Sequence, residues 1–418
     1  MAQLKDDCFA FGGALMTLPD ALAELRDRIT VVAERETVAT NQALGRILAK
    51  DIVSDRNVPP HDNSAVDGYA VRFQDLNDDC ESAFPVFARI AAGHPLKVAV
   101  PPGQAVQIFT GAPMPKGVDT VFMKEDCDVQ GDQVILPPGL KQGANARKLG
   151  EDITKGDVII AKGTRFRAQE VGLTASVGVA EVDVYKRLKV AVFSTGDEIF
   201  DLGRDVPAGG IYDSNRYVLI ALLQGLGVEI HDLGILQDDE ATITDALEKA
   251  AKDHDLIMTS GGVSVGDEDH IKPAVERLGS IDFWRLAIRP GRPIALGQVR
   301  GRAFVGLPGN PVAAMVTFLN IARPMISLLA GEACNRPSAF TVEAGFEYRK
   351  KQGRREWLRA MIETRGDGTV VAEKYPSDGA GILTSLVAAD GLIELAEDVG
   401  FVGFGDKVEF IPFKGILS

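Results

Sequence analysis

From Leu188 onward, apolar runs alternate with segments in which apolar residues recur every three or four positions. The runs LKVAVFSTG, VEIHDLGIL, DLIMTS and AFVGLP are typical of strands, and the segments near 214–224, 239–252 and 267–278 are typical of helices. Near-continuous apolar strands that alternate with helices predict a parallel sheet covered on both faces. An insert, residues 281–299, is predicted to form a hairpin with Arg-Pro-Gly-Arg at its turn.

The chain on either side of this region has a different pattern. Helices are predicted near 19–28 and 41–50, followed by a stretch rich in Pro, Gly and Asp that contains only short strand-like runs. After residue 330 long helices stop, and short strands recur between glycine turns, which is typical of a small β-barrel.

The predicted fold class is α/β multidomain. Its domains are a discontinuous α/β linker domain at 1–52 plus 151–187, an inserted β-rich domain at 53–150, a central doubly wound parallel-sheet α/β domain at 188–330 and a C-terminal β-barrel at 331–418.

The composition of the chain argues against nucleic-acid binding, zinc sites and disulfide frameworks. The 418 residues are 45% hydrophobic and 25% charged, as in soluble globular proteins. The net charge of -14 opposes a nucleic-acid role, because phosphate backbones are bound mainly by basic surfaces. The four cysteines form no C-x-x-C pair and the five histidines show no ligand spacing, so zinc sites and disulfide frameworks are unsupported. A reducing cytoplasm fits this cysteine usage.

Neither a signal peptide nor a membrane span is expected. The N-terminus carries Asp6 and Asp7 where a signal peptide needs basic residues. The most apolar segment, 311–330, is interrupted by Asn320, Arg323 and Pro324, so it cannot supply ~20 unbroken membrane-spanning residues. We interpret it as a buried helix.

The strand-to-helix turns of the central domain are the candidate ligand site, because open parallel sheets bind ligands at the carboxyl ends of their strands. Four turns stand out, at residues 194–198, 238–240, 260–269 and 306–311. The first two end apolar strands with carboxylates, and the last two are glycine-rich.

The turn from Ser260 to Gly266 is predicted to help hold an anionic, phosphate-bearing ligand. Its glycines allow close backbone approach, and the helix that follows points free N–H groups at the same place. Asn310 as N-cap with Pro311 after it predicts a second helix start at the same crevice. A plain tight turn that needs small residues is the alternative.

Arginines are the second expected source of anion binding. A helix terminus contributes only ~0.3–1 kcal/mol to a nearby anion, whereas micromolar affinity needs about 8 kcal/mol. Arg285, Arg289 and Arg292 lie within eight residues of an acidic chain and suggest an oxyanion clamp. The alternative is a solvated charged face.

Several carboxylates could hold Mg²⁺ beside a phosphate if they converge, since hard cations take oxygen ligands. Taken singly, each is equally interpretable as a cap or a surface charge. Ser264 has no base nearby in sequence, so nucleophilic catalysis is disfavoured. The carboxylates are Asp67, Asp152, Glu198, Asp238 and Asp269.

Eight motifs occur in register: VPPHDNSAVDGYAV, FTGAPMPKGVDTV, KLGEDI, STGDEI, YDSN, TSGGVSVGDEDHIK, RPGRP and GLPGNPVAA. In this order they resemble the molybdopterin molybdenumtransferase family over nearly the whole chain. The resemblance implies insertion of molybdate into adenylylated molybdopterin with Mg²⁺, with release of AMP and the molybdenum cofactor. It also implies an elongated homodimer whose active site lies between subunits, in the cytoplasm, with a molybdopterin adenylyltransferase as the upstream enzyme.

The resemblance also implies roles for individual residues. Asp67 and Thr110 match contributors from the partner subunit, and Asp152, Glu198, Asp238 and Asp269 match catalytic acidic residues, with Asp238 and Asp269 as Mg²⁺ ligands. Substrate-binding matches are Gly261, Gly262, Ser264, Gly266, Pro308, Gly309, Asn310, Pro311, Arg354 and Ser385, together with Arg285, Arg289 and Arg292.

One departure and two alternatives accompany the resemblance. Family members commonly have Lys at the positions of Arg285, Arg289 and Arg292, so charge is kept while bidentate geometry is introduced. The enzymatic alternative is a molybdopterin adenylyltransferase-like protein, which resembles only the central domain. The non-enzymatic alternative is a scaffold of the kind found in the animal relative gephyrin.

Overall fold

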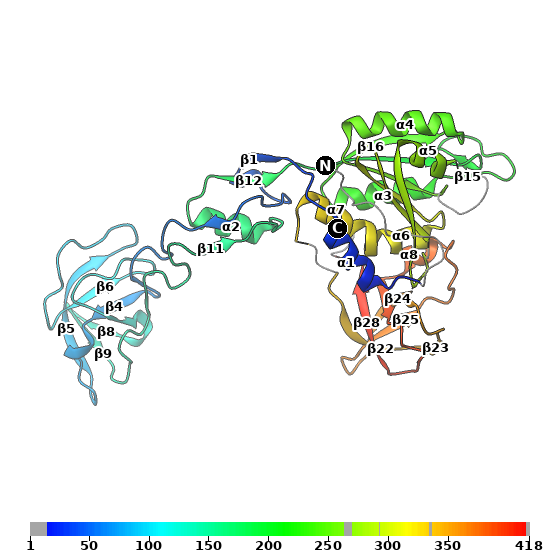
Figure 1. Cartoon of the computed structure of the whole chain (residues 1–418). Coiled ribbons are helices and arrows are strands. Elements are labelled where there is room, and N and C mark those ends of the chain that lie inside the picture. Colours follow the sequence, from blue (N-terminus) through cyan, green and yellow to red (C-terminus); the bar gives the residue numbers. More distant parts are fainter. Residues whose placement is uncertain (1–14, 263–269, 292, 334–336, 415–418) are drawn as a thin grey trace.

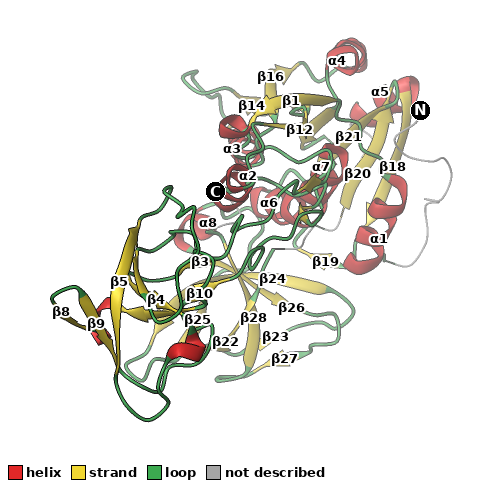
Figure 2. Ribbon diagram, turned by 90° about the vertical axis from the view of Figure 1, so that its left-hand side faces the viewer, coloured by secondary structure: helices red, strands yellow, loops and turns green. Residues whose placement is uncertain are grey.

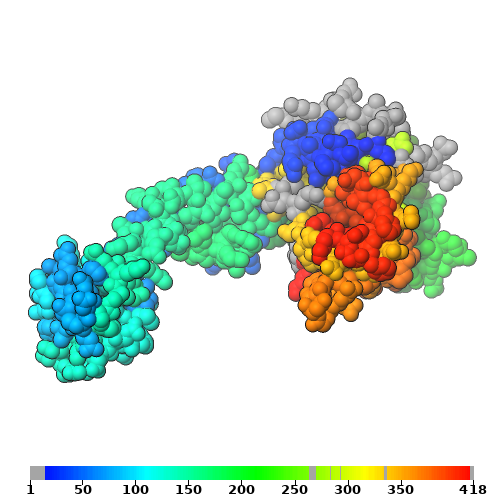
Figure 3. Space-filling view, turned by 90° about the horizontal axis from the view of Figure 1, so that it is seen from below, coloured from blue at the N-terminus to red at the C-terminus, as the bar shows by residue number. Residues whose placement is uncertain are grey.

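A computed structural model describes residues 15–262, 270–291, 293–333 and 337–414. The chain forms a body and an arm that extends away from it (Figure 1). The body contains the central sheet, its helices and the C-terminal strands, while a β-rich unit lies at the far end of the arm. Figure 3 shows the same separation from below, with the far end of the arm projecting well beyond the body.

Six strands form the central sheet, in the order β16-β13-β17-β21-β20-β18. The first four are parallel, as predicted from the apolar runs, whereas β18 and β20 pair antiparallel at one edge. The predicted insert is therefore a hairpin that extends the same sheet, which makes the sheet mixed rather than wholly parallel. The strands are β13 (Lys189–Thr195), β16 (Glu229–Leu236), β17 (Leu256–Ser260), β18 (Gly279–Arg285), β20 (Pro293–Val299) and β21 (Arg302–Leu307).

Helices cover both faces of this sheet, so the doubly wound arrangement is confirmed (Figure 2). On one face, α4 and α5 bury Leu247 and Val275 against Phe193 of β13. On the other face, α1, α3, α6 and α7 share one large core with Val192. The helices are α1 (Leu18–Arg28), α3 (Ser214–Gly225), α4 (Glu240–Asp253), α5 (Ile271–Leu278), α6 (Pro311–Thr317) and α7 (Arg323–Ala330), with the π-helical η4 (Phe318–Ala322) between α6 and α7.

The apolar segment Pro311–Ala330 is a core helix. By length and composition it could cross a membrane, and it is the one such helix among the described residues. However, 89% of its apolar window is buried inside the protein, and Asn320 donates to the carbonyl oxygen of Val316 at 2.9 Å within the helix itself. The predicted buried helix is confirmed.

The near part of the arm contains two short antiparallel pairs, β1 with β12 and β2 with β11, and one helix, around a core with Leu48, Phe166 and Val184. The predicted helix at 41–50 was wrong. Only the 3-10 turn η1 (Thr40–Gln42) forms there, because Gly45 takes a φ of 74° in the left-handed region, which ends helical winding. The elements are β1 (Arg35–Ala39), β2 (Ile52–Val53), β11 (Val158–Ile160), α2 (Ala168–Ser176) and β12 (Glu181–Tyr185).

The far end of the arm is a six-stranded sheet in the order β7-β4-β6-β5-β9-β8, with the short pair β3 and β10 beside it. Two small cores hold it together, one around Phe84 and Phe122 and one around Ile90 and Ile108. The elements are β3 (Asn63–Ser64), β4 (Gly68–Val71), η2 (Phe73–Asp75), β5 (Ser82–Ile90), β6 (Ala105–Ile108), β7 (Thr120–Met123), η3 (Lys124–Asp126), β8 (Asp128–Gln130), β9 (Gln133–Leu136) and β10 (Ala146–Arg147).

The C-terminal strands close into the predicted barrel. Its five strands follow the order β24-β25-β22-β28-β26, and β26 pairs back onto β24. The short strand β19 pairs with the start of β24, which joins the central insert to the barrel. The elements are β19 (Ile288–Arg289), β22 (Phe340–Ala344), β23 (Tyr348–Arg349), β24 (Arg355–Thr364), β25 (Val370–Lys374), α8 (Thr384–Ala388), β26 (Gly391–Leu395), β27 (Phe401–Val402) and β28 (Lys407–Pro412).

Candidate functional site

A cleft of about 750 Å³ lies where the carboxyl ends of the central strands meet a loop of the barrel. Its walls come from the turns after β13, β17 and β21, the turn of the insert and the loop after β25. The lining residues are Glu198, Gly261, Gly262, Arg289, Pro290, Gly291, Pro293, Pro308, Gly309, Asn310, Ala313, Asp378, Gly379 and Ala380.

The glycine turn after β17 needs its small residues. Gly261 and Gly262 both have positive φ, 88° and 64°. A Cβ on Gly262 would lie 2.7 Å from Ile271 Cδ1 and 3.0 Å from Thr195 Cγ2, so a side chain cannot be placed there without displacement. The N–H of Gly261 donates to the carbonyl oxygen of Leu307 at 3.0 Å, which ties this turn to the next strand. The predicted residues Ser264, Gly266 and Asp269 lie outside the described residues.

The turn after β21 forms the neighbouring wall. Asn310 occupies the N-cap of α6 and Pro311 its first position, as predicted. The N–H of Val312 in that first turn donates to the carbonyl oxygen of Ala380 at 3.0 Å. The barrel loop is therefore hydrogen-bonded directly to the start of α6, which closes this side of the cleft.

Arg289 brings positive charge into the cleft. Its Nη1 lies 3.3 Å from the hydroxyl of Tyr348 and 3.4 Å from Oε1 of Glu356, which is buried. Partial burial opposes the charge, but Tyr348 and Glu356 outweigh it and raise the pKa of Arg289 above its ordinary value. The guanidinium therefore stays charged beside the cleft, with half of its side-chain surface exposed.

The other two predicted arginines are placed differently. Arg285 is exposed on β18, opposite Pro293, and is absent from the cleft lining among the described residues. Arg292 lies outside the described residues. One of the three arginines is thus seen at the cleft.

Two predicted carboxylates lie on the central domain. Glu198 lines the cleft, folded over the turn so closely that a Cβ on Gly196 would meet its Oε2 at 2.7 Å. Asp238, just after β16, accepts a hydrogen bond of 2.9 Å from the hydroxyl of Thr195 at the end of β13. Among the described residues, no group of three His, Cys, Asp or Glu side chains is arranged to hold a metal ion.

Three predicted residues lie on the arm, away from the cleft of the same chain. Asp67, immediately before β4, accepts from the N–H and the hydroxyl of Thr110 at 2.8 and 2.7 Å. These two hydrogen bonds lower the pKa of Asp67 below its ordinary value. Asp152 is exposed, and its N–H donates to the carbonyl oxygen of Val58 at 3.0 Å.

The two predicted barrel residues do not line the cleft. Arg354 lies in the turn before β24. Ser385 is buried behind the wall, where its hydroxyl accepts from Arg359 Nε at 3.0 Å. Arg359 Nη2 in turn donates to the carbonyl oxygens of Ser377 and Gly379, at 2.8 and 3.1 Å. Ser385 therefore supports the lining loop through Arg359.

Sequence reasoning missed the barrel loop itself. Asp378, Gly379 and Ala380 line the cleft, and Asp378 pairs with Lys374 at 2.6 Å. The only sequence feature that could have indicated them is the glycine-containing turn SDGAG between two short strands, and nothing in that pattern says which domain it faces.

Three family profiles match consecutive parts of the chain. They are described as the MoeA N-terminal region (domain I and II), over residues 16–178, a probable molybdopterin binding domain, over residues 191–327, and the MoeA C-terminal region (domain IV), over residues 341–413.

Whole-length relatives decide the family. The molybdopterin molybdenumtransferase of Haemophilus influenzae is 38% identical over 406 residues, which is 97% of this chain and 100% of that protein. The chain belongs to the molybdopterin molybdenumtransferase family. A second member of this family, from Nostoc sp., is 36% identical over 383 residues, with 90% of this chain and 88% of that protein covered.

A solved structure supports the same architecture for this molybdopterin molybdenumtransferase family member. The crystal structure of the molybdopterin biosynthesis moeA protein from Pyrococcus horikoshii superposes with a TM-score of 0.81 at 29% identity, covering 96% of this chain and 100% of that one. The multidomain fold is therefore MoeA-like, and the resemblance seen in the motifs is confirmed.

Proposed function

We propose that the chain inserts molybdate into adenylylated molybdopterin, releasing AMP and the molybdenum cofactor. The observation that carries this proposal is the cleft in which two glycine-containing turns and Arg289 converge. Its volume of about 750 Å³ suits a ligand larger than a single oxyanion. Membership of a transferase family supports the reaction class.

Anion binding would rest on backbone and guanidinium donors. Gly261 and Gly309 lack side chains that would keep a phosphate from the backbone. Within the described residues Arg289 is engaged only through Nη1, so the rest of its planar fork is available for two parallel hydrogen bonds to an oxyanion. Each charge-assisted hydrogen bond contributes roughly 1.5–3 kcal/mol.

We propose that the reaction uses Mg²⁺, held by carboxylates of which the described part of the chain supplies two, since no group of three is formed there. Glu198 lines the cleft, and the carboxylate of Asp238, just after β16, accepts a hydrogen bond from the hydroxyl of Thr195 at the end of β13. Oxygen donors of this kind are what Mg²⁺ takes in proteins, and we propose these two residues, with Asp269, as its holders. When bound, the ion would neutralise charge on the phosphoanhydride as it breaks.

We further propose a homodimer in which the arm of one subunit completes the cleft of the other. Asp67 and Thr110 are exposed and mutually hydrogen-bonded, yet they lie on the arm, far from the cleft of their own chain. A second copy related by a two-fold axis would bring this pair to the cleft. An upstream molybdopterin adenylyltransferase would supply the substrate, in the cytoplasm.

The test is a single-turnover assay with purified protein, adenylylated molybdopterin, molybdate and Mg²⁺. We expect AMP to be released only when molybdate is present, and at a much lower rate in Asp67→Asn. Asp75→Asn is the matched control, because Asp75 is another carboxylate on the same unit that accepts a hydrogen bond from a backbone N–H, that of Gly103 at 2.7 Å.

Two other outcomes would contradict the proposal. Formation of the adenylate from ATP and molybdopterin would favour an adenylyltransferase-like enzyme. No AMP release, combined with tight binding of a partner's peptide, would favour a scaffold.

A further inference from the structure

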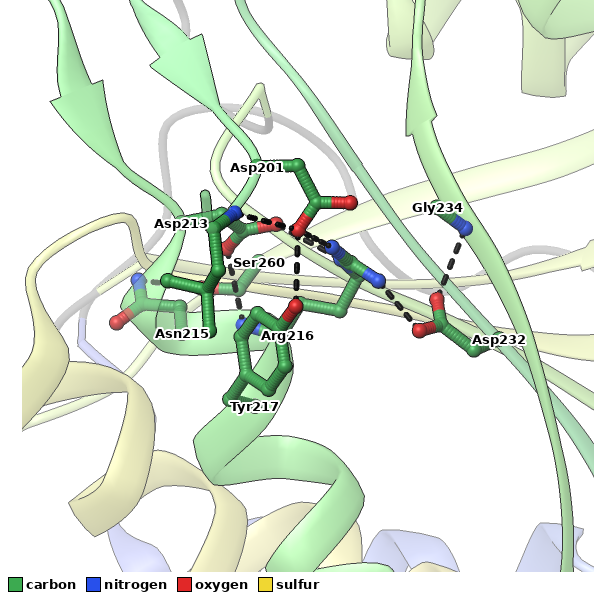
Figure 4. A network of polar contacts seen from close by, with 9 residues as sticks. Asp201, Asp213, Asn215, Arg216, Tyr217, Asp232, Gly234 and Ser260 are labelled. Carbon is green, nitrogen blue, oxygen red and sulfur yellow. Dashed lines mark hydrogen bonds and ion pairs between the residues drawn. The ribbon is translucent and has the colours of Figure 1, made fainter. Parts of the chain in front are cut away.

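The first turn of α3 lies where three walls of the cleft meet, although none of its residues lines the cleft in the described chain. This turn carries the sequence YDSN and the residues that follow it, to which the proposed reaction assigns no role. Figure 4 shows its side chains reaching in two directions, Asn215 toward Ser260 and Arg216 toward Asp201 and Asp232.

Asn215 joins the two glycine-containing turns. Its Nδ2 donates to the hydroxyl oxygen of Ser260 at 2.9 Å and to the carbonyl oxygen of Gly309 at 2.7 Å. The Ser260 hydroxyl in turn donates to the carbonyl oxygen of Pro308 at 2.9 Å, which adds a second link between the two turns. One amide group therefore bridges the wall formed after β17 and the wall formed after β21, in addition to the hydrogen bond from the Gly261 N–H to Leu307.

Arg216 holds the start of α3 against the wall of the cleft that carries Glu198. Its guanidinium has only 2% of its side-chain surface exposed and bonds Asp213, Asp232 and Asp201 (Figure 4). Asp213 is the N-cap of α3, Asp232 lies on β16, and Asp201 follows β14 (Ile199–Phe200). One buried guanidinium therefore joins these three elements through hydrogen bonds to carboxylates, which are stronger than hydrogen bonds between neutral groups.

The wall so fixed is the one that carries Glu198. This residue directly precedes β14, which pairs with β15 (Ile211–Tyr212) just before α3. The N–H of Ile211 donates to the carbonyl oxygen of Glu198 at 2.8 Å, and that of Asp213 to Phe200 at 2.9 Å. The backbone of Glu198 is thus tied to the start of α3.

We infer that Asn215 is a positioning residue that sets the spacing of the two anion-binding turns, with Arg216 holding α3 and the Glu198 wall in register with them. The inference rests on the proposed function for its effect on substrate. Sites of this kind need their groups held within about 0.5 Å, and a misplacement of about 1 Å can cost 10²-fold in rate. Asn215 thereby acts without touching the reacting atoms.

The experiment compares Asn215→Asp with Tyr217→Phe in the full-length protein. The aspartate keeps the shape of the side chain but has no N–H to donate, so it faces the Gly309 carbonyl oxygen with a second acceptor. Tyr217→Phe removes a hydrogen bond of 2.8 Å to Asp201 from the same helical turn without touching either glycine-containing turn. Asn215→Ala is a second variant in case the aspartate does not fold.

The first readout is hydrogen exchange without substrate, in peptides covering 256–262 and 303–310. In both Asn215 variants we expect the amide protons of these peptides to exchange at least about tenfold faster, including the Gly261 N–H that donates to Leu307. A tenfold increase corresponds to a decrease of about 1.4 kcal/mol in the free energy of local opening. Tyr217→Phe should leave these peptides unchanged. Unchanged exchange in both Asn215 variants would overturn the inference.

The second readout is AMP release from adenylylated molybdopterin. We expect the Asn215 variants to raise KM at least about tenfold while the thermal midpoint stays near that of Tyr217→Phe. A fall in the thermal midpoint with unchanged KM would show a merely structural role and overturn the inference. Failure of the wild type to release AMP would overturn the proposed function instead, and the exchange data would still decide the role of Asn215.

Discussion

The hydroxyl and the backbone N–H of Thr110 both donate to a single carboxylate oxygen of Asp67, at 2.7 and 2.8 Å. The two residues belong to different loops of the arm, one before β4 and one after β6. Two donors on one oxygen hold the carboxylate in one orientation, as the catalytic role proposed for Asp67 requires.

Replacing Thr110 by valine should loosen Asp67 while leaving the fold intact. The hydroxyl donor is lost and the N–H donor remains, so we expect the lowered pKa of Asp67 to rise toward its ordinary value of 3.8. Asp67 stays ionised at neutral pH in both proteins, so a several-fold loss in AMP release would report orientation rather than charge.

The measurement is a carboxyl NMR titration together with the AMP assay. Thr37→Val is the matched control, because the Thr37 hydroxyl also donates to an aspartate, Asp183, at 2.8 Å, but on the near part of the arm. An unchanged pKa of Asp67 in Thr110→Val would show that the hydroxyl bond is not formed.

A shared active site predicts complementation between two inactive variants. Asp67→Asn removes the carboxylate on the arm and Arg289→Ala removes the guanidinium at the cleft, so the homodimer of either variant should lose AMP release. In a mixed dimer, the cleft of the Asp67→Asn subunit would receive an intact arm from the other subunit. Random reassociation should therefore restore about a quarter of wild-type AMP release, since half of the dimers are mixed and each has one intact site.

The control is Asp67→Asn alone taken through the same subunit exchange, because every cleft then receives an altered arm. If the mixture of arm and cleft variants stayed as inactive as its parents after verified subunit exchange, each site would have to be built within one chain.

Two adjacent glycines in the turn after β17 allow the cost of backbone strain to be separated from the cost of crowding by a side chain. Gly261 and Gly262 both have positive φ, so alanine at either position should cost roughly 1–2 kcal/mol of backbone strain. Only at Gly262 would the new methyl group press on Ile271 and Thr195. Overpacking there should add about 1–3 kcal/mol to the loss in unfolding free energy.

Chemical denaturation of Gly262→Ala and Gly261→Ala should therefore differ by that additional amount. Equal losses would mean that the turn relaxes freely around the methyl group, and that close packing is not the reason for glycine at position 262.

Much of the central domain could be predicted because its signals are local. The run from Val190 to Thr195 is buried throughout, as expected of a strand with helices on both faces, and α3 and α4 begin within a residue of the predicted positions. The helix predicted at 41–50 failed because one left-handed glycine, Gly45, decides the backbone there.

The candidate site was predictable where it depends on strand ends and not where it depends on domain packing. Gly261, Gly309 and Glu198 follow apolar strands, so their turns were expected at one edge of the sheet. Ala380 reaches the cleft only because the barrel docks on α6, a contact between residues far apart in sequence. Asp67 lies on a separate unit, away from the cleft of its own chain, so reasoning from strand ends could not connect it with that cleft.

One ion pair should contribute strongly to the junction between arm and body, beside backbone hydrogen bonds such as that from the Ala333 N–H to Gly163 at 2.9 Å. Arg165, on the arm, makes a bidentate contact with Glu332 beside α7, with Nε to Oε1 at 2.8 Å and Nη2 to Oε2 at 2.7 Å. Its Nη1 also donates to the carbonyl oxygens of Gly45 and Leu226, at 3.0 and 3.1 Å. Arg165→Met removes all four contacts and leaves a partly buried carboxylate behind.

We expect Arg165→Met to lower the free energy of unfolding at pH 7 by about 2–4 kcal/mol, somewhat less than loss of a fully buried pair, because both side chains keep some exposure. Arg167→Met is the matched control. Arg167 pairs with Glu170 but has 69% of its side-chain surface exposed, so its loss should lower the free energy of unfolding far less than the loss of Arg165 does.

The stabilisation by the Arg165–Glu332 pair should depend on pH, and the direction of the pKa shift of Glu332 decides on which side it is lost. Burial favours the neutral form of Glu332, but Arg165 and Ser327 outweigh it and hold the pKa of Glu332 below its ordinary value of 4.5. Because the folded pKa is the lower one, the stabilisation is fully present above pH 4.5 and is lost as pH falls through the folded pKa. Denaturation curves of wild type and Arg165→Met should therefore converge on acidification. A difference that stayed constant down to the acid limit would show that the arginine acts through its carbonyl contacts rather than through the pair with Glu332.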